Sequence, residues 1–232
     1  MTDVVIPDSV DVISFDLDDT LWNGTHVILH AEQAMLNWMQ QHTPRVQAEF
    51  SATELRDKKI QFIKTHPHLA YKVSAARVQF LQWLFTDLAY DNANELAQAC
   101  FEAFYDARQQ VTLFDDVLDV LTQLKQHYRL IAITNGNADV DKTGLAGMFE
   151  FCLQGEYFIK PKPHADIFQH ALTRLACQPE QVLHVGDHPV QDMQGAHAVG
   201  MKTCWLDDGS RQWNKDFNAH FTIPHVRHLK PN

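Results

Sequence analysis

Two carboxylates stand two residues apart where an apolar run of the chain ends. The run Val10–Phe15 is typical of a buried strand, and Asp16, Asp18 and Thr20 follow it. Residues i and i+2 of a strand share a face, so the two acids would point the same way if the strand continued. Like charges held this close repel, and one pKa rises unless a cation neutralises the pair. The pattern predicts a hard metal ion, a proton shuttle or both; the alternative is a strand end whose solvated acids begin a turn.

Composition and charge limit the partners of the chain. Its 232 residues are 45% hydrophobic and carry a formal net charge of -10, which disfavours nucleic acid and anionic membranes. A small phosphorylated substrate is still compatible, because a bound dication and one Lys can set the field inside a pocket. The cysteines form no C-x-x-C pair, the N-terminus has no signal-like segment, and no run approaches the roughly 20 apolar residues of a membrane span. We expect reduced thiols and a cytoplasmic protein.

Short apolar runs alternate with amphipathic helical patterns. The runs that suit buried central strands are Val10–Asp16, Leu130–Thr134, Val182–Gly186 and Lys202–Leu206. Weaker candidates for edge strands are Phe151–Leu153 and Phe221–Ile223. Helices are expected at Asp115–His127, His164–Ala176 and Val190–Val199. The alternation predicts an α/β fold with a doubly wound parallel sheet, whose ligands bind beyond the carboxyl ends of the strands.

The segment from residue 24 to residue 110 breaks this alternation. It has no convincing strand and four helical stretches, near Val27–His42, Ser51–Lys64, Ser74–Ala89 and Asn92–Gln109. Ser51 with Glu54, and Asn92 with Glu95, have the spacing of capping boxes. We therefore predict an α/β core of residues 1–23 and 111–232 with an all-helical insertion of residues 24–110. The insertion is expected to be a lid over the sheet edge or, alternatively, a purely structural bundle.

Four polar clusters, each at a predicted strand end or in a loop beyond one, resemble the motifs of the haloacid dehalogenase (HAD) superfamily of phosphohydrolases. The matching residues are Asp16, Asp18 and Thr20; Thr134; Lys162-Pro163 with Ile167-Phe168; and Gly186, Asp187, Asp192, Gly195 and Ala196. The resemblance covers nearly the whole chain. It implies a Rossmann-like core, and it identifies the helical insertion with the family's type 1 cap.

The resemblance implies an aspartyl-phosphate mechanism, which elementary chemistry also favours. A phosphate monoester needs a nucleophile, a proton for its leaving oxygen and positive charge around the transferring group. Asp16 would be the nucleophile, and Asp18 would protonate the leaving alcohol and then accept a proton from the attacking water. Magnesium would be held by Asp16, by Asp187 and by the backbone carbonyl of Asp18.

Further residues would hold the phosphoryl group. Thr134, Asn135 and Lys162 are the expected phosphate ligands, and Asp192 would support the site through a metal-bound water or by orienting Lys162. Lys160 competes with Lys162, because each precedes a Pro. The family's spacing to Phe168 favours Lys162.

Three aromatic residues lie next to the motifs in the sequence, outside the expected catalytic set. His184 is expected to pack in its strand, and His188 to lie in a loop near the pocket. Trp22 belongs either to the core or to the border of the substrate channel.

A closer resemblance concerns the bacterial HAD phosphatases of riboflavin synthesis. It rests on Phe15–Leu21 with Val27–Leu29, Ile131–Ala138, Leu183–Asp187, Gly200-Met201 and Cys204-Trp205. It implies a small phosphorylated substrate, 5-amino-6-(5-phospho-D-ribitylamino)uracil or flavin mononucleotide (FMN), hydrolysed by a monomer or homodimer. The alternatives are another metabolite phosphatase, a metal-independent haloacid dehalogenase and a non-catalytic binding module. Asp18 favours phosphoryl transfer, because an acid there is needed only when a leaving oxygen takes up a proton.

Overall fold

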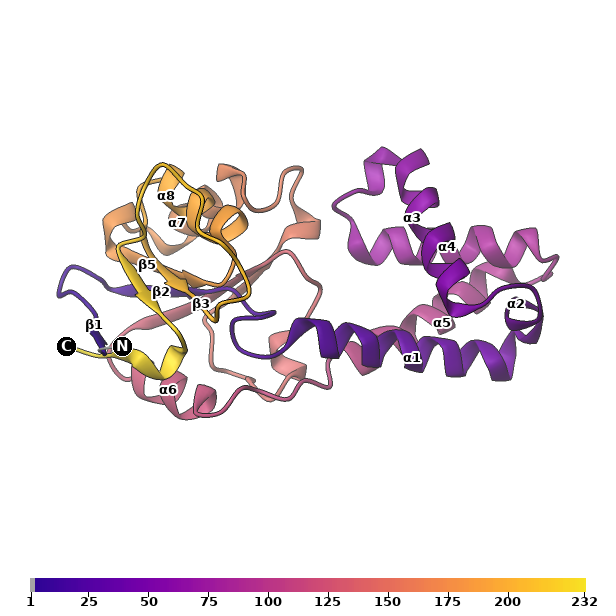
Figure 1. Ribbon diagram of the computed structural model, residues 1–232, viewed down its shortest axis with the longest axis horizontal. Helices are drawn as coiled ribbons and strands as arrows, with labels where there is room; N and C mark the ends of the chain where they lie inside the picture. The colour runs from indigo at the N-terminus through magenta and orange to yellow at the C-terminus, as the bar shows by residue number, and fades with distance from the viewer. Residues whose placement is uncertain (1–2) are drawn as a thin grey trace. The chain divides into compact units, whose positions relative to one another are not determined.

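The computed structural model describes residues 3–232 and divides the chain into two compact units (Figure 1). The α/β unit comprises the chain up to Gly24 together with Val111–Asn232, and the helical unit comprises Thr25–Gln110. Within residues 3–232, none of the helices combines the length and the apolar character needed to span a bilayer.

The α/β unit is built on a six-stranded sheet in which all neighbouring strands are parallel, in the order β4-β3-β2-β5-β6-β7. The strands are β2 (Val12–Phe15), β3 (Arg129–Thr134), β4 (Cys152–Gln154), β5 (Val182–Gly186), β6 (Lys202–Leu206) and β7 (Phe221–Ile223). Every residue of β2 and of β5 is buried. Continuous burial is typical of a parallel sheet covered on both faces. The predicted doubly wound α/β fold is confirmed, with the two weaker strand candidates at the edges.

Helices cover both faces of this sheet, with α7 and α8 on one side and α6 on the other (Figure 1). They are α6 (Val117–Leu124), α7 (Ala165–Leu175) and α8 (Gly195–Ala198), and a π-helical turn, η5 (Pro189–Gln194), precedes α8. The sequence predicted one regular helix over residues 190–199, but the first half is wound more widely. The Nδ1 atom of His188 accepts hydrogen bonds from the backbone N–H groups of Val190 and Gln191. Such π-turns are frequent at functional sites.

One face of the sheet forms a continuous hydrophobic core with α7 and α8. The buried members are Val12, Ile131, Ile133, Leu153, Ile167, Phe168, Ala171, Leu175, Val182, Ala196 and Met201. On α7 these residues recur three and four positions apart, so they share one side of the helix. The packing fixes α7 and α8 against the strands, and it thereby positions the polar residues at the strand ends.

Short elements complete the α/β unit. Strand β1 (Val4–Val5) pairs in parallel with β8 (Leu229–Lys230) as a separate two-stranded sheet, which the sequence patterns did not predict. The remaining elements are the 3-10 turns η2 (Val140–Lys142), η3 (Gly155–Tyr157), η4 (Pro179–Gln181) and η6 (Val226–His228).

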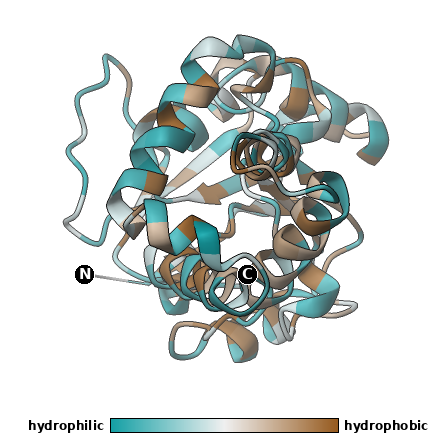
Figure 2. Cartoon of the chain, turned by 90° about the vertical axis from the view of Figure 1, so that its right-hand side faces the viewer, coloured by the Kyte–Doolittle hydropathy of each residue, from teal (hydrophilic) through white to brown (hydrophobic). Residues whose placement is uncertain are grey.

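The helical unit contains five α-helices and one 3-10 turn. They are α1 (Gly24–His42), α2 (Pro44–Glu49), α3 (Ala52–Thr65), η1 (Pro67–Leu69), α4 (Val73–Asp87) and α5 (Ala93–Arg108). Hydrophobic and hydrophilic residues lie side by side on the same helices (Figure 2), which is typical of amphipathic helices around a core. That core includes Met39, Leu81, Leu84, Phe85 and Ala97, all with 1% exposure or less.

Two details of the helical unit differ from the sequence expectations. The short helix α2, which begins at Pro44, was expected only as a break. The capping box of Ser51 and Glu54 is confirmed, but Asn92 makes no capping hydrogen bond with its side chain. Asn92 has φ -107° and ψ 40°, whereas Ser51 has the extended backbone that lets a cap side chain reach the helix N–H groups.

Candidate active site

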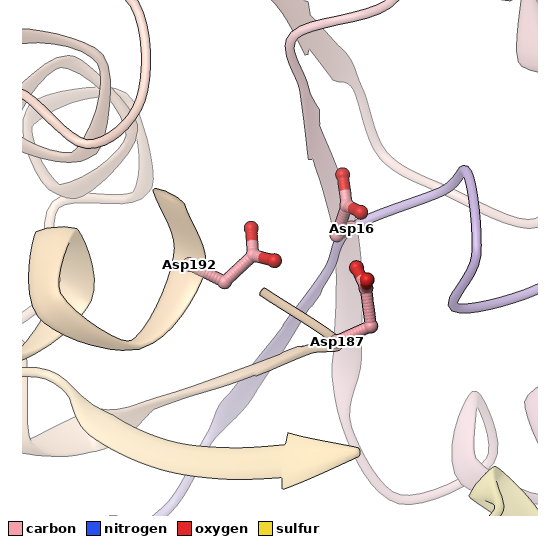
Figure 3. Close-up of side chains that lie close together, drawn as sticks. All are labelled: Asp16, Asp187 and Asp192. Atoms are coloured by element: carbon pink, nitrogen blue, oxygen red, sulfur yellow. The ribbon is translucent and has the colours of Figure 1, made fainter. Parts of the chain in front are cut away.

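Three carboxylates converge beyond the carboxyl ends of neighbouring strands (Figure 3). Asp16 follows β2, Asp187 follows β5, and Asp192 lies on η5. One oxygen from each lies within 4.8 Å of the others, and all three residues are buried. Because β2 and β5 pair in parallel, residues that follow them emerge at the same edge of the sheet.

Lys162 lies between two of these acids. Its Nζ donates hydrogen bonds to Oδ1 of Asp16 at 2.7 Å and to Oδ1 of Asp192 at 2.6 Å, and its side chain is 1% exposed. Lys160 is exposed. The structure therefore brings Lys162 to the acidic cluster, and it leaves Lys160 at the surface.

Asn135 positions the loop that carries Lys162. Its Oδ1 accepts a hydrogen bond from the backbone N–H of Lys162 at 3.1 Å, and its Nδ2 donates to the carbonyl of Lys162 at 2.9 Å and to Oε1 of Gln191 at 3.0 Å. The side-chain amide expected to bind phosphate thus uses both of its N–H donors within the protein. Thr134 ends β3, and its Oγ1 accepts from the N–H of Gly136 at 2.9 Å. As an acceptor there, its hydroxyl keeps a proton for a further partner.

Asp192 is anchored from several sides. Its Oδ2 accepts a hydrogen bond from the backbone N–H of His188 at 3.0 Å, and its Oδ1 lies 3.3 Å from Nε2 of His184. The other ring nitrogen of His184 lies 3.0 Å from Oγ of Ser14. A Cβ at Gly186 would come within 2.5 Å of Cγ of Asp192, so a side chain there would displace the carboxylate. His184, expected only to pack in its strand, also contacts a carboxylate of the cluster.

Asp18 lies in a tight turn outside the three-carboxylate cluster. Its Oδ1 accepts a hydrogen bond from Nε1 of Trp22 at 2.8 Å, and Gly24 leaves room where a Cβ would come within 2.8 Å of Cβ of Asp18. Trp22 is fully buried, so it belongs to the core. Thr20 is also buried, and its hydroxyl has no hydrogen-bond partner among residues 3–232. Because Trp22 donates to one oxygen of the half-buried Asp18, the direction of this carboxylate is fixed.

The cations near the three carboxylates are too few to neutralise all of them. Burial, opposed by Lys162 and reinforced by Asp192 and Asp187, raises the pKa of Asp16 well above its ordinary range. Burial and Asp192 raise the pKa of Asp187 to about 6, although Arg211 acts against this. Burial also disfavours the ionised form of Asp192, but Lys162 and His184 outweigh it and hold the pKa of this carboxyl low. Ionised Asp16 and Asp187 therefore favour an additional cation.

Arg211 is a site residue that the sequence patterns missed. Its Nε donates a hydrogen bond to Oδ2 of Asp187 at 2.7 Å, and its Nη2 lies 3.7 Å from Oδ2 of Asp19. The guanidinium comes from the segment that follows β6, and its side chain is 36% exposed. A single Arg in an irregular segment carries no motif, so only its contacts reveal its place.

The donor set fits a hard divalent cation. All three side chains that converge offer carboxylate oxygens, the ligands that Mg²⁺ prefers. Asp192 already accepts hydrogen bonds from Lys162 and His188, which leaves Asp16 and Asp187 as the carboxylates with oxygens for a metal. The third predicted ligand is the backbone carbonyl oxygen of Asp18. The cluster of three carboxylates is defined by side-chain atoms alone, so this ligand stays a prediction.

A family comparison agrees with this geometry. Residues 10–200 match the family model of haloacid dehalogenase-like hydrolases. The chain belongs to this family. The predicted family and fold are confirmed, and the matched segment contains each of the predicted site residues.

Individual relatives include phosphatases and a protein named as a dehalogenase. The chain is 29% identical to the 5-amino-6-(5-phospho-D-ribitylamino)uracil phosphatase YigB of Escherichia coli, over 95% of this chain and 94% of the relative. It is 25% identical to a glyceraldehyde 3-phosphate phosphatase of Methanopyrus kandleri, over 95% of each chain. Its structure matches that of a 2-haloacid dehalogenase from Pseudomonas syringae with a TM-score of 0.87 and 33% identity, over 94% of this chain and 95% of the other. The family and the phosphatase relatives support the expected enzyme class, a phosphoric monoester hydrolase.

Proposed function

We propose that this protein is a magnesium-dependent phosphatase that hydrolyses a small phosphate monoester through an aspartyl-phosphate intermediate. The observation that carries the proposal is the placement of Lys162 between Asp16 and Asp192, with Asp187 beside them. Such a cluster offers a nucleophile, a fixed positive charge and carboxylates for a dication around one small volume. These are the requirements of phosphoryl transfer.

Asp16 is the nucleophile in this proposal. Its carboxylate oxygen attacks phosphorus, the bond between phosphorus and the ester oxygen breaks, and the phosphoryl group is carried as an acyl phosphate. Asp18 donates a proton to the leaving alkoxide, then accepts one from the water that hydrolyses the acyl phosphate. The hydrogen bond from Trp22 supports this role, because it fixes the direction of the Asp18 carboxylate.

Other side chains would hold the phosphoryl oxygens and the metal. Lys162 supplies positive charge and Thr134 a hydroxyl donor, whereas Asn135 acts by positioning the Lys162 loop. Mg²⁺ would be held by Asp16, Asp187 and the backbone carbonyl of Asp18, and when bound it would supply positive charge to the phosphoryl oxygens. The assignment of residues 24–110 as a cap that selects the substrate belongs to the same proposal.

The dehalogenase relative defines the second candidate function. A haloacid dehalogenase would form an ester at the same nucleophile, would release halide and would need neither a metal nor a proton donor at residue 18. Phosphate release from monoesters with Mg²⁺, and no chloride release from 2-chloropropionate, would support the phosphatase. Chloride release without Mg²⁺, and no phosphate release, would assign the protein to the dehalogenases.

The substrate proposal rests on the YigB relative. We propose 5-amino-6-(5-phospho-D-ribitylamino)uracil, with FMN as a second substrate, because the likeness to that phosphatase extends over 95% of this chain. The test is kcat/KM for both compounds beside glyceraldehyde 3-phosphate, phosphoserine and nucleotides, since this ratio measures discrimination. A clear preference for one of the other compounds would overturn the substrate and leave the phosphatase class intact.

A further inference from the structure

The helical unit contains a cavity that is lined by its own residues alone. It has a volume of about 170 Å³ and lies among α1, α3 and α4. Much of its wall is apolar, with Met35, Met39, Leu55 and Phe80 each at most 8% exposed. An apolar cavity of about 150 Å³ is large enough to bind benzene. The space therefore suits a body of about one aromatic ring.

One side of this cavity carries three cations around a single carboxylate. Glu32 contacts Lys59 at 3.0 Å, Arg56 at 3.2 Å and Arg77 at 3.9 Å, and all four residues line the cavity. The side chains of Lys59 and Arg77 are only 20% and 11% exposed. Arg56 is 56% exposed, but one carboxylate cannot neutralise both Lys59 and Arg77, so one positive charge remains in a setting of reduced solvation. Such an excess favours a further anion.

Arg77 is the least satisfied of these cations. A guanidinium has five N–H donors, but its one hydrogen-bond acceptor among the described residues is Sδ of Met35 at 3.8 Å, a weak acceptor. The group also lies 3.5 Å above the centre of the Phe104 ring. Burial lowers the pKa of Arg77 to about 10, so the guanidinium is still charged at neutral pH. The stacking on Phe104 fixes the guanidinium plane and leaves its N–H groups without a strong acceptor.

Ordinary structural packing accounts poorly for this arrangement. A buried ion-pair cluster that only stabilised the fold would balance its charges, because unpaired buried charge is costly. Here the unbalanced charge of Lys59 and Arg77 lies beside a largely apolar cavity wall. The two features together describe a ligand that has one acidic group and one apolar body.

We propose that this cavity binds a small organic carboxylate with an apolar body of about one ring. The carboxylate contacts Lys59 and Arg77, and the body lies against Met35, Met39, Leu55 and Phe80. The site lies wholly within residues 29–80, whereas the proposed catalytic residues lie between 16 and 18 and between 134 and 192. The inference is therefore independent of the phosphatase proposal, and either can fail alone.

Benzoate is the probe, because it combines a carboxylate with a single ring. The full-length protein with ¹³C-labelled methionine methyl groups is titrated with benzoate, and the signals of Met35 and Met39 are followed by NMR. Benzamide has the same shape without the charge, and inorganic phosphate has the charge without the ring. We expect saturable shifts at both methionines with benzoate, binding of benzamide that is weaker by about tenfold or more, and no shift with phosphate.

Three single substitutions, two on α3 and one on α1, sharpen the test. Lys59→Gln removes a charge at the cavity and is expected to weaken benzoate binding about tenfold or more. Lys58→Gln is the matched control, because its Nζ lies 4.3 Å from the centre of the Phe50 ring and Lys58 does not line the cavity. Glu32→Gln removes the competing carboxylate and is expected to tighten the binding. A purely structural cluster predicts no such gain.

The proposal is overturned if neither methionine signal shifts up to the solubility limit of benzoate. It is equally overturned if benzamide binds as well as benzoate, or if Lys59→Gln and Lys58→Gln bind benzoate alike. The comparison of benzoate with benzamide uses the unaltered protein, so the test stands even where a variant does not fold.

Discussion

Each of the two units of this protein contains a cluster of charged side chains, and the two clusters have an excess of opposite sign. In the α/β unit, three carboxylates converge, of which Asp16 and Asp192 contact the ammonium of Lys162 and Asp187 contacts the guanidinium of Arg211. In the helical unit, three cations surround the single carboxylate of Glu32. Each cluster leaves an excess of one sign where solvent screens it poorly. The first is therefore suited to a dication with a phosphoryl group, and the second to an organic anion.

The difference between the clusters lies in what holds them. The acidic cluster is carried by two strand ends and the turn η5, and it is fixed by Asn135, His184 and the close approach at Gly186. The basic cluster is carried by long side chains on three helices, beside open apolar space. Reactive groups need fixed positions, whereas a binding cavity tolerates adaptable side chains. Catalysis is accordingly proposed for the first cluster and binding alone for the second.

The largest expected effect comes from removing the nucleophile. Asp16→Asn should reduce hydrolysis of p-nitrophenyl phosphate to the uncatalysed background, because an amide oxygen cannot form the acyl phosphate. Asp119→Asn, an exposed acid on α6, is the control and should retain the full rate. Near-normal turnover by the Asp16 variant would contradict the assignment of catalysis to the acidic cluster.

Removing the proton donor should have the next largest effect, and its size should depend on the leaving group. Asp18→Asn is expected to lower kcat/KM, which reports the step in which the leaving group departs, about 10²–10⁴-fold on an alkyl phosphate, the range for general acid–base groups. The loss should be smaller on p-nitrophenyl phosphate, because nitrophenolate leaves readily without a proton. Equal losses on both esters, or a loss under about threefold on the alkyl ester, would contradict the role of Asp18.

The acidic cluster should cost stability when no metal is bound. The pKa of Asp187 rises on folding from 3.8 to about 6, so the folded state holds this proton more tightly than the unfolded chain does. Stability from this group is therefore lost as the pH rises from about 4 through about 6. At pH 7, Asp187→Asn should stabilise the metal-free protein by on the order of 1–3 kcal/mol.

The measurement is thermal unfolding of chelator-treated protein, with and without added Mg²⁺. Mg²⁺ should raise Tm of the unaltered protein by mass action and leave Tm of the Asp187 variant unchanged. Equal Tm gains in both proteins would show that Asp187 is not a metal ligand.

The smallest expected effect concerns Arg211. Its positive charge on Asp187 opposes a metal at the same carboxylate, so Arg211→Gln should tighten Mg²⁺ binding, by up to about fivefold for a partly exposed ion pair. Trp205 reports the binding, since its Nε1 donates to the carbonyl of Asp187 at 2.9 Å. A tryptophan fluorescence titration in which Arg211→Gln binds Mg²⁺ more weakly would contradict this competition. Lys215→Gln, in the same segment, is the control.

The sequence predicted what short-range patterns and parallel-sheet geometry determine. Apolar runs located the strands, and strand ends located Asp16, Thr134 and Asp187, because parallel strands bring their carboxyl ends to one edge. The spacing of Ser51 and Glu54 correctly predicted a capping box. The same spacing at Asn92 and Glu95 did not, because the backbone angles of Asn92 are not those of a capping residue.

Contacts between distant segments were beyond the sequence patterns. Arg211 reaches Asp187 from a segment without a motif, and Asn135 faces the Lys162 backbone because two loops meet. The cavity of the helical unit depends on how side chains of three helices fill space, and no periodicity encodes that. Tertiary packing decides such features.

The most direct test of the central claim is to locate the covalent intermediate. The protein is mixed with Mg²⁺ and p-nitrophenyl phosphate, quenched in acid within the first turnover, digested and mapped by mass spectrometry. We predict one added phosphoryl group on the peptide that contains Asp16, and none in Asp16→Asn. A phosphoryl group on another residue, or steady turnover with no phosphorylated peptide at any quench time, would contradict the account.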